Sequence, residues 1–378
     1  MIIRNACVYT EEGRFEAKDI YIEGTEFADQ PRQEKEVLDG EGCIAIPGLT
    51  DIHFHGCMGA DFSDGNMRAL DEIAGYEAKN GITTIVPATM TLPEELLQQS
   101  CEVACEFRKQ QEAGKKEKKA VLCGIHMEGP FVSEEKLGAQ NPDYVRRADQ
   151  KMFDRMQEKS GGMIRFVDIA PETDGAMDFI RDNKKRTVLS LAHTGADYDT
   201  AGKAFAAGVS HVTHLYNAMT PFTHRNPGVI GAAVDAKAEA ELICDGVHVH
   251  PSAVRMALKL FGEDRIIFIS DSMRAAGLKD GTYTLGGQKV EVKGRYARLE
   301  NGNLAGSVTN LMDCLRWAVK EAGIPLTTAV KCAAVNPAKS AGIYEKYGSI
   351  TPGKAANLVL LRKEDLSIKS VILNGEIL

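Results

Sequence analysis

The sequence lacks the features that would place the protein in a membrane, outside the cell or on nucleic acid. No apolar run approaches the roughly 20 residues that a bilayer-spanning helix needs. The N-terminal segment has neither the basic region nor the long apolar core of a signal peptide. The net charge of −8 argues against a main binding surface for nucleic acid or anionic lipid. Nine cysteines without framework spacing suit a reducing compartment, so we expect a cytoplasmic protein with free thiols.

The chain contains two kinds of pattern. With 378 residues, 44% of them hydrophobic, it can bury a large core. Residues 1–47 and 343–378 hold short apolar runs broken by turn signals, which predict short β-strands at both ends. Residues 48–342 alternate apolar strands with amphipathic helices. We therefore expect one large domain over residues 48–342 and a small β-sandwich domain built from both ends of the chain.

Eight apolar segments in the large domain are typical of parallel strands. They are residues 50–55, 83–87, 121–127, 164–169, 188–193, 209–213, 242–244 and 266–270. Because most of them are followed by a helical pattern, they favour the α/β class and a closed (β/α)8 barrel of the TIM type over an open sheet. The Gly-rich segment 277–301 predicts hairpins inserted after the last barrel strand.

Side chains that can bind a metal ion stand at the ends of these strands. They are His53, His55, Glu128, His193, His214 and Asp271. Each alone could be an ordinary buried polar residue. Catalytic groups in such barrels gather at the C-terminal ends of the strands, however, and imidazoles with carboxylates are metal-ligand sets. His126 and His211 lie deeper in their strands, where we expect them to orient ligands or to bond within the core.

This set of residues predicts metal-assisted hydrolysis. Glu128, His193 and His214 could hold one divalent ion and leave a position for water, whose pKa such an ion lowers to about 7. Asp271 could take the proton of that water and pass it to a leaving nitrogen. The arrangement suits hydrolysis of an amide or a related C–N bond.

The same residues resemble the amidohydrolase superfamily of barrel hydrolases, and the tail over residues 348–360 resembles a frequent ending there. Within the superfamily, several stretches resemble the N-acetylglucosamine-6-phosphate deacetylase family in the same order. They are His126-Met-Glu-Gly-Pro-Phe131, Thr213-His-Leu-Tyr-Asn-Ala-Met219, His224-Arg-Asn-Pro-Gly228, Asp245-Gly-Val-His248, Ser270-Asp-Ser-Met273 and Leu304-Ala-Gly-Ser307.

The resemblance implies a reaction in which the N-acetyl amide of N-acetylglucosamine 6-phosphate is hydrolysed to glucosamine 6-phosphate and acetate. The three ligands named above would hold the catalytic metal, and Asp271 would be the general base and acid. Because the chain keeps the His-x-His pair, a second ion on His53 and His55, bridged by Glu128, is an alternative to a single ion. Zinc is the expected metal, with iron, manganese and cobalt as alternatives.

The resemblance also implies a set of substrate contacts and a partner. The contacts would come from Ala139, Gln140, Asn217, Ala218, Arg225, His248, Leu304, Ala305 and Gly306. Arg225 would grip the phosphate by reaching into the partner's site of a homodimer, because a planar guanidinium suits a phosphate dianion. His248 would touch the sugar or its acetyl group, and residues 304–306 would line the acyl side.

Two positions depart from the family pattern. Gln140 stands where His is frequent; it can hydrogen-bond a sugar hydroxyl but cannot become cationic. Asn357 stands in the tail where Asp is usual.

Two alternative functions remain open. Another amidohydrolase acting on an N-acyl or cyclic amide is disfavoured, because residues 163–170 lack the lysine that many of those enzymes carboxylate to bridge two metals. A non-catalytic phosphosugar-binding barrel is disfavoured by Asp271, since binding alone does not require a group that shuttles protons.

Overall fold

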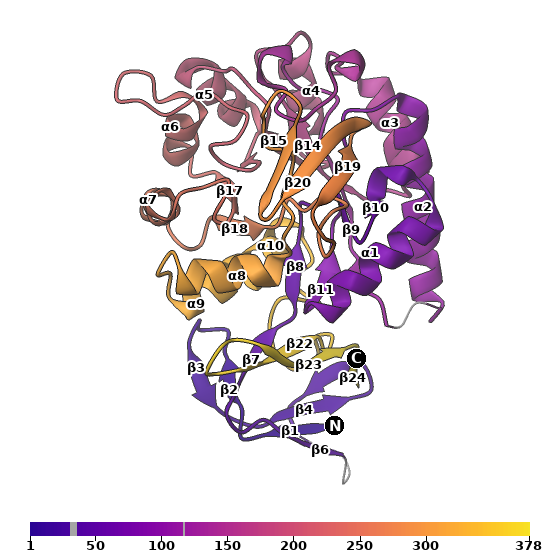
Figure 1. The fold of residues 1–378 in the computed structure, drawn as a ribbon, viewed down its shortest axis with the longest axis vertical. Helices are drawn as coiled ribbons and strands as arrows, with labels where there is room; N and C mark the ends of the chain where they lie inside the picture. The colour runs from indigo at the N-terminus through magenta and orange to yellow at the C-terminus, as the bar shows by residue number, and fades with distance from the viewer. Residues whose placement is uncertain (31–35, 116–117) are drawn as a thin grey trace.

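Parallel strands form the centre of the computed structural model, which describes residues 1–30, 36–115 and 118–378 (Figure 1). A six-stranded parallel sheet runs in chain order through β13 (Ile125–Met127), β14 (Ile164–Ile169), β15 (Val188–Leu191), β16 (His211–Val212), β17 (Glu239–Ile243) and β18 (Ile266–Ile269). A three-stranded parallel sheet contains β8 (Leu49–Asp51), β11 (Ile82–Ile85) and β12 (Val121–Leu122). The predicted α/β class is confirmed.

Connections at both edges join the two parallel sheets. β12 and β13 are the halves of the segment predicted as one strand over residues 121–127, and each half belongs to a different sheet. At the other edges, the Asp271 N–H donates to the His53 carbonyl over 3.0 Å, and the Ser270 hydroxyl donates to the Asp51 carboxylate over 2.5 Å. The ends of the first and last parallel strands therefore lie side by side.

Helices lie outside these strands (Figure 1). They are α1 (Met67–Lys79), α2 (Glu94–Glu112), α3 (Gln150–Lys159), α4 (Ala176–Asn183), α5 (Tyr198–Ala207), α6 (Gly228–Asp235), α7 (Pro251–Phe261), α8 (Leu311–Lys320), α9 (Leu326–Val330) and α10 (Asn336–Ser340). Their limits follow local sequence: the Asn66 side chain caps α1 by accepting from the Ala69 N–H, and Pro251 opens α7, where a missing N–H is tolerated. No helix in the described residues is both long and apolar enough to cross a membrane.

The segment predicted to form hairpins after the last parallel strand does so. It contains an antiparallel sheet of β19 (Gly281–Leu285), β20 (Gln288–Lys293) and β21 (Tyr296–Leu299). The Gln288 amide donates to the Ala139 carbonyl over 2.6 Å, and the Asn303 amide donates to the Gly138 carbonyl over 3.3 Å. These bonds tie the inserted sheet to the loop after β13, at the C-terminal ends of the parallel strands.

Strands from both ends of the chain pair with one another. One sheet has the order β24-β23-β22-β7-β2-β3, with β24 (Glu376–Ile377), β23 (Ile368–Leu373), β22 (Leu358–Arg362), β7 (Cys43–Pro47), β2 (Cys7–Tyr9) and β3 (Phe15–Ala17). A second has the order β5-β4-β1-β6, with β5 (Glu26–Ala28), β4 (Ile20–Glu23), β1 (Ile2–Arg4) and β6 (Val37–Asp39). A separate buried cluster combines Ile3, Val8 and Ile22 with Leu358 and Leu360. The two termini thus share a core of their own, below the parallel strands in Figure 1.

The structure corrects the start of one strand. The sequence predicts a strand over residues 242–244, whereas β17 begins at Glu239 and ends at Ile243. The difference places Glu241 inside a strand that is buried along four of its five residues. The carboxylate of Glu241 misled the prediction of this strand, because carboxylates are rare inside buried strands unless they are paired.

We expect Leu360→Ala to destabilise the shared core of the two termini. Leu360 is 0% exposed and pairs with Ala45 of β7, so the truncation leaves a cavity costing about 2–5 kcal/mol. Urea unfolding measures the change. The matched Leu260→Ala truncation, at a position that is 40% exposed on α7, should change stability by less than about 0.5 kcal/mol. Equal losses in the two variants would contradict a packed core at the paired ends.

Candidate metal centre

A cavity of about 320 Å³ opens at the C-terminal ends of the parallel strands. Twelve of the fifteen residues predicted from the sequence line it: His55, Glu128, Ala139, Gln140, His193, His214, Asn217, Ala218, His248, Asp271, Leu304 and Gly306. Of the other three, His53 is 0% exposed beneath the cavity and Ala305 is buried behind it. Arg225 lies elsewhere, on an exposed segment.

The Glu128 carboxylate lies at the centre of the cluster. Its Oε1 is 2.9 Å from His193 Nε2 and 3.1 Å from His214 Nε2, and those two ring nitrogens are 3.1 Å apart. All three side chains are almost fully buried. The sequence places them on three separate strand ends, and the fold brings one ligand atom of each within 4.8 Å of the others.

A second group of ligand atoms adjoins the first. His55 Nε2 is 3.3 Å from both Glu128 Oε2 and Asp271 Oδ1. His53 Nε2 is 3.7 Å from Glu128 Oε1 and 4.0 Å from Asp271 Oδ1. Glu128 therefore faces His193, His214 and His53 with Oε1, and faces His55 with Oε2.

The donor atoms fit a divalent cation. The Nδ1 of His193 lies 2.9 Å from the Lys136 carbonyl, so Nδ1 is a donor nitrogen and the ring directs Nε2 at Glu128. Electron-pair donors that face one another at about 3 Å in a buried site need a cation among them, either ring protons or a metal ion. His53 Nε2 and Glu128 Oε2 likewise have no hydrogen-bond partner in the part of the chain that the structure describes.

Backbone strain coincides with three of these residues. His193, His214 and Asp271 have φ values of 44°, 32° and 47°, in the left-handed region that non-glycine residues rarely adopt. Each such residue costs on the order of 1–3 kcal/mol and persists where the surroundings impose it, often at functional sites. Each of the three lies two residues beyond the last residue of its strand, β15, β16 or β18.

Both carboxylates of the centre are held in the charged form. Burial alone would raise the pKa of Glu128, but hydrogen bonds from His193 and His214 hold that pKa well below its ordinary value. Burial similarly opposes ionisation of Asp271, and the neighbouring His55 and His53 lower its pKa. At neutral pH the site therefore offers an anionic ligand in Glu128 and a proton acceptor in Asp271.

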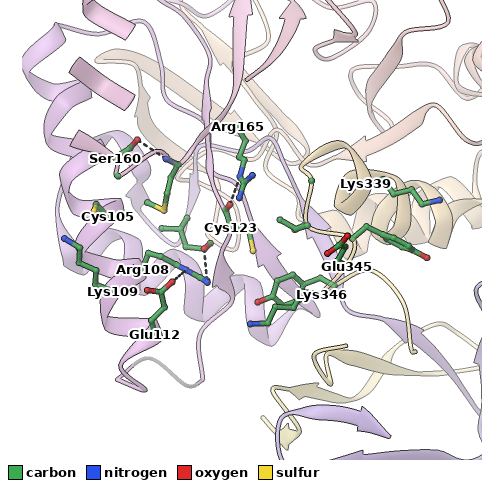
Figure 2. Close-up of a pocket in the computed structure, with 17 residues that line it drawn as sticks. Cys105, Arg108, Lys109, Glu112, Cys123, Ser160, Arg165, Lys339, Glu345 and Lys346 are labelled. Atoms are coloured by element: carbon green, nitrogen blue, oxygen red, sulfur yellow. Dashed lines mark hydrogen bonds and ion pairs between the residues drawn. The ribbon is translucent and has the colours of Figure 1, made fainter. Parts of the chain in front are cut away.

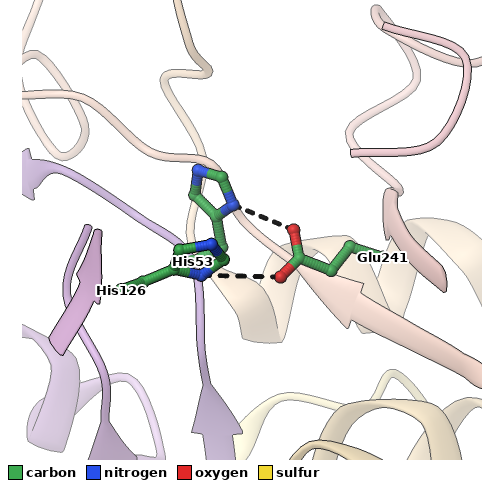
Figure 3. A group of neighbouring side chains, drawn as sticks. All are labelled: His53, His126 and Glu241. Atoms are coloured by element: carbon green, nitrogen blue, oxygen red, sulfur yellow. Dashed lines mark hydrogen bonds and ion pairs between the residues drawn. The ribbon is translucent and has the colours of Figure 1, made fainter. Parts of the chain in front are cut away.

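Glu241 is a part of the site that the sequence alone did not reveal. Its Oε2 accepts from His53 Nδ1 over 2.9 Å (Figure 3) and from the His214 backbone N–H over 3.2 Å. Its Oε1 lies 3.7 Å from His126 Nδ1. Glu241 thus orients one candidate ligand by its ring and another by its backbone. A carboxylate within the apolar run Ala240–Cys244 was the signal that could have revealed it.

His126 and His211 lie below the cluster, as expected from their depth in the strands. Both nitrogens of His126 are engaged: Nδ1 with the Ile52 carbonyl at 3.0 Å and Nε2 with Asp168 Oδ1 at 2.9 Å. His211 Nδ1 bonds the Ser190 hydroxyl at 2.9 Å. His126 has no ring nitrogen left for a metal, so its contacts are those of a buried, bonded histidine.

Two cavity residues are fixed by their neighbours. The Thr91 backbone N–H donates to Gln140 Oε1 over 2.7 Å, which leaves only the amide nitrogen of Gln140 for other contacts. His248 Nδ1 lies 2.8 Å from Asp245 Oδ2. Burial opposes protonation of His248, yet the Asp245 carboxylate raises its pKa above the ordinary value.

Arg225 does not line this cavity. It lines a separate hollow with Asp197, Tyr198 and Asn226, near the start of α6. No Lys or Arg lines the metal cavity among the residues that the structure describes. The positively charged side chains that can meet an anionic group there are therefore histidines, such as His248 with its raised pKa.

Known proteins match the chain over its full length. The amidohydrolase family matches residues 44–378. The N-acetylglucosamine-6-phosphate deacetylase of Bacillus subtilis (strain 168) is 38% identical over 378 residues, which cover 100% of this chain and 93% of the relative. The N-acetylgalactosamine-6-phosphate deacetylase of Escherichia coli O157:H7 is 32% identical over 379 residues, which cover 100% of this chain and 98% of the relative.

Solved structures match equally well. The N-acetylglucosamine-6-phosphate deacetylase from Pasteurella multocida has a TM-score of 0.92 at 29% identity, covering 100% of this chain and 99% of that one. An Asp-to-Ala variant of the Mycobacterium smegmatis enzyme, in complex with N-acetyl-D-glucosamine-6-phosphate, has a TM-score of 0.90 at 31% identity. It covers 100% of this chain and 98% of that one.

We expect Glu241→Gln to weaken metal binding about 10–100-fold, the usual effect of losing a partner that orients a ligand. The neutral amide keeps the shape but removes the charge that holds His53 Nδ1–H. Competition with a chromogenic chelator measures the affinity. The control is Glu239→Gln on the same strand, where the carboxylate accepts a hydrogen bond from Ser340. Unchanged metal affinity in Glu241→Gln would show that His53 is held by packing alone.

Proposed function

Because the chain belongs to the amidohydrolase family, we propose that it hydrolyses the N-acetyl amide of N-acetylglucosamine 6-phosphate to glucosamine 6-phosphate and acetate. The observation that carries the proposal is the convergence of Glu128, His193, His214 and Asp271 on one cavity. Relatives that match the whole chain and carry this activity in their names support the substrate.

Glu128, His193 and His214 would hold a divalent metal, with zinc the first candidate and iron, manganese or cobalt as alternatives. His53 and His55 would hold a second ion bridged by Glu128, and the 3.3 Å separation of His55 Nε2 from Glu128 Oε2 supports this arrangement. When bound, such an ion supplies a water of lowered pKa, about 7, as the nucleophile.

Asp271 would act as the general base and then the general acid. Its lowered pKa keeps it ionised at neutral pH, so it can accept the proton of the attacking water. The same carboxyl can then give that proton to the amide nitrogen as the C–N bond breaks. Its position, 3.3 Å from His55 Nε2 at the rim of the cavity, puts it beside the candidate metal ligands.

The sugar would be held by residues that line the cavity. Gln140 would offer its amide nitrogen to a hydroxyl, and His248 would contact the sugar or its acetyl group. Backbone groups of Asn217 and Ala218 would contribute further contacts, as would Ala139. Residues 304–306 would line the acyl side.

The phosphate would be bound by Arg225 of a second copy in a homodimer. The described lining of the cavity contains no Lys or Arg, yet a buried phosphate dianion needs a cationic partner. Arg225 is exposed and lies on a segment that extends beyond the strands, so it is available to a neighbouring subunit.

We further propose that the eight parallel segments close into a (β/α)8 barrel over residues 48–342. The bond from the Asp271 N–H to the His53 carbonyl, at the open edges of the two sheets, supports closure. Residues 1–47 and 343–378 would form the small β-sandwich domain, supported by the pairing of β7 with β22. The cytoplasmic location expected from the sequence stays a prediction.

A second candidate substrate is N-acetylgalactosamine 6-phosphate, which the Escherichia coli relative names. The two sugars differ only at the 4-hydroxyl, so the same amide chemistry would act on both. Rates of acetate release from the two phosphosugars, compared side by side, decide between them.

We expect Asp271→Asn to lower kcat by about 10²–10⁴ while leaving the metal content intact, because the amide cannot accept the proton of the attacking water. Acetate release measures the rate and elemental analysis measures the metal. The matched control is Asp264→Asn, an exposed position on the chain just before β18. Wild-type turnover in Asp271→Asn would assign proton transfer to another residue.

The phosphate role of Arg225 predicts a difference between substrates. Arg225→Ala should lower kcat/KM for the phosphosugar at least about 30-fold, the usual cost of truncating one partner of a buried charge pair. It should leave the poor rate on unphosphorylated N-acetylglucosamine unchanged. Mixing Arg225→Ala with Asp271→Asn subunits should restore part of the activity if the arginine acts across an interface. Equal losses on both sugars would assign Arg225 a structural role.

A further inference from the structure

A second cavity, of about 800 Å³, lies at the end of the parallel strands away from the metal centre. It is lined by residues at the N-terminal side of β14 and around the break between β12 and β13, such as Met163 and Cys123. None of its lining residues belongs to the metal cavity. The two cavities therefore lie at opposite ends of the strands.

The walls of this second cavity carry an excess of positive charge. Five basic side chains, Arg108, Lys109, Arg165, Lys339 and Lys346, line it with only two acidic ones, Glu112 and Glu345. The excess contrasts with the formal net charge of −8 for the whole chain. In Figure 2 the basic residues of α2 lie on one side, Lys339 and Lys346 lie on the other, and Arg165 lies between them.

Most of these cations lack a carboxylate partner. Arg108 is paired, since its Nε donates to Glu112 over 2.9 Å and its NH1 donates to the Leu122 carbonyl over 3.2 Å. For the other four, no ion pair joins them to a carboxylate within the described ranges 1–30, 36–115 and 118–378. Charges gathered in a concave site without partners raise the local concentration of anions.

Arg165 is an exposed residue of β14 that lines the cavity. Its Nε donates to the Cys123 carbonyl over 3.3 Å. Its stem lies against Gly124, where a Cβ would overlap the Arg165 Cγ. The glycine thus makes room for the stem of the arginine, and the hydrogen bond to Cys123 directs its guanidinium.

The fields of three of these cations overlap at Cys123. Burial raises the pKa of its thiol to about 12, while Arg108, Arg165 and Lys346 each act to lower it. Side chains from α2, β14 and the segment after α10 therefore converge on one point. The positive side chains come from three separate segments of the chain. This distinguishes the cavity from a helix surface that carries a row of solvated lysines.

We propose that this cavity binds a small organic molecule that carries two phosphate groups. Its volume falls within the usual range for small-molecule sites. Basic side chains on two facing walls suit two separated anionic groups, and the Arg165 guanidinium suits a phosphate in particular. The rings of Tyr344 and Tyr347 lie beside these cations, with Lys339 Nζ 4.9 Å from the first ring and Lys346 Nζ 5.8 Å from the second.

Isothermal titration calorimetry of the metal-loaded full-length protein with fructose 1,6-bisphosphate tests the proposal. The wild type should show one saturable site with a Kd below about 1 mM. Arg165→Ala/Lys346→Ala should weaken binding at least about ten-fold, since two charge-assisted contacts are lost. Both residues are exposed, so the variant should keep its fold and its deacetylase rate.

Two further variants test whether the bisphosphate binds in this cavity rather than elsewhere on the protein. Lys203→Ala/Lys259→Ala removes the same charge from exposed positions on α5 and α7 and should bind the bisphosphate as the wild type does. Arg225→Ala should also bind it unchanged, because the metal cavity is not involved. The proposal is overturned if the wild type gives no saturable heat, if both double variants lose affinity equally, or if only Arg225→Ala loses it. None of these outcomes bears on the deacetylation reaction.

Discussion

A buried carboxylate surrounded by imidazoles is the constraint on which the rest of the structure depends. Glu128 is 3% exposed and has ring nitrogens of four histidines within 3.7 Å. A carboxylate buried without compensation costs several kcal/mol, so the strands must deliver cationic or metal-binding partners to this point. The histidines come from the ends of three different strands, which can meet only if the sheets are joined edge to edge. The polar rim, the strained backbone at His193 and His214, and the bond between Asp271 and His53 all follow from that requirement.

The sequence alone was enough to select a candidate site residue where that residue follows the end of a recognisable strand. Apolar segments with helices between them indicated the parallel strands, and the rule that catalytic groups lie at strand ends selected Glu128, His193 and Asp271. Glu241 was beyond this reasoning, because its role depends on a neighbour 188 positions away in the chain, His53. Only the register of β17 shows that its carboxylate points at that ring. The position of Arg225 was beyond it for another reason: its motif gives a residue type, and only the fold shows that the side chain lines a hollow separate from the metal cavity.

The two faces of the parallel strands have different electrostatic characters. Negative and neutral groups gather at the C-terminal ends, where Glu128 and Asp271 are kept ionised by histidines. Basic groups gather at the other face, around Arg165. Between them lies a layer of apolar strand residues such as Phe166 and Ile267, each 0% exposed. Because that layer separates the two sets of charges, they form no direct pairs, and substitutions on one face should have effects that add to those on the other.

Gln140 shows how one departure from a family pattern can be compensated within the fold. Its Oε1 must be the acceptor, because the group it meets is the Thr91 backbone N–H. The amide is therefore oriented, and its nitrogen, which donates to the Met90 sulfur over 3.9 Å, can act only as a donor. A cationic histidine at this position would add charge next to the sugar, whereas the amide adds none and avoids the cost of desolvating a charge in a buried site. At this wall of the cavity, the neutral amide nitrogen of Gln140 can recognise a ligand only by donating to an acceptor atom. The charge of this cavity is then set by its histidines and by Glu128 and Asp271, not by position 140.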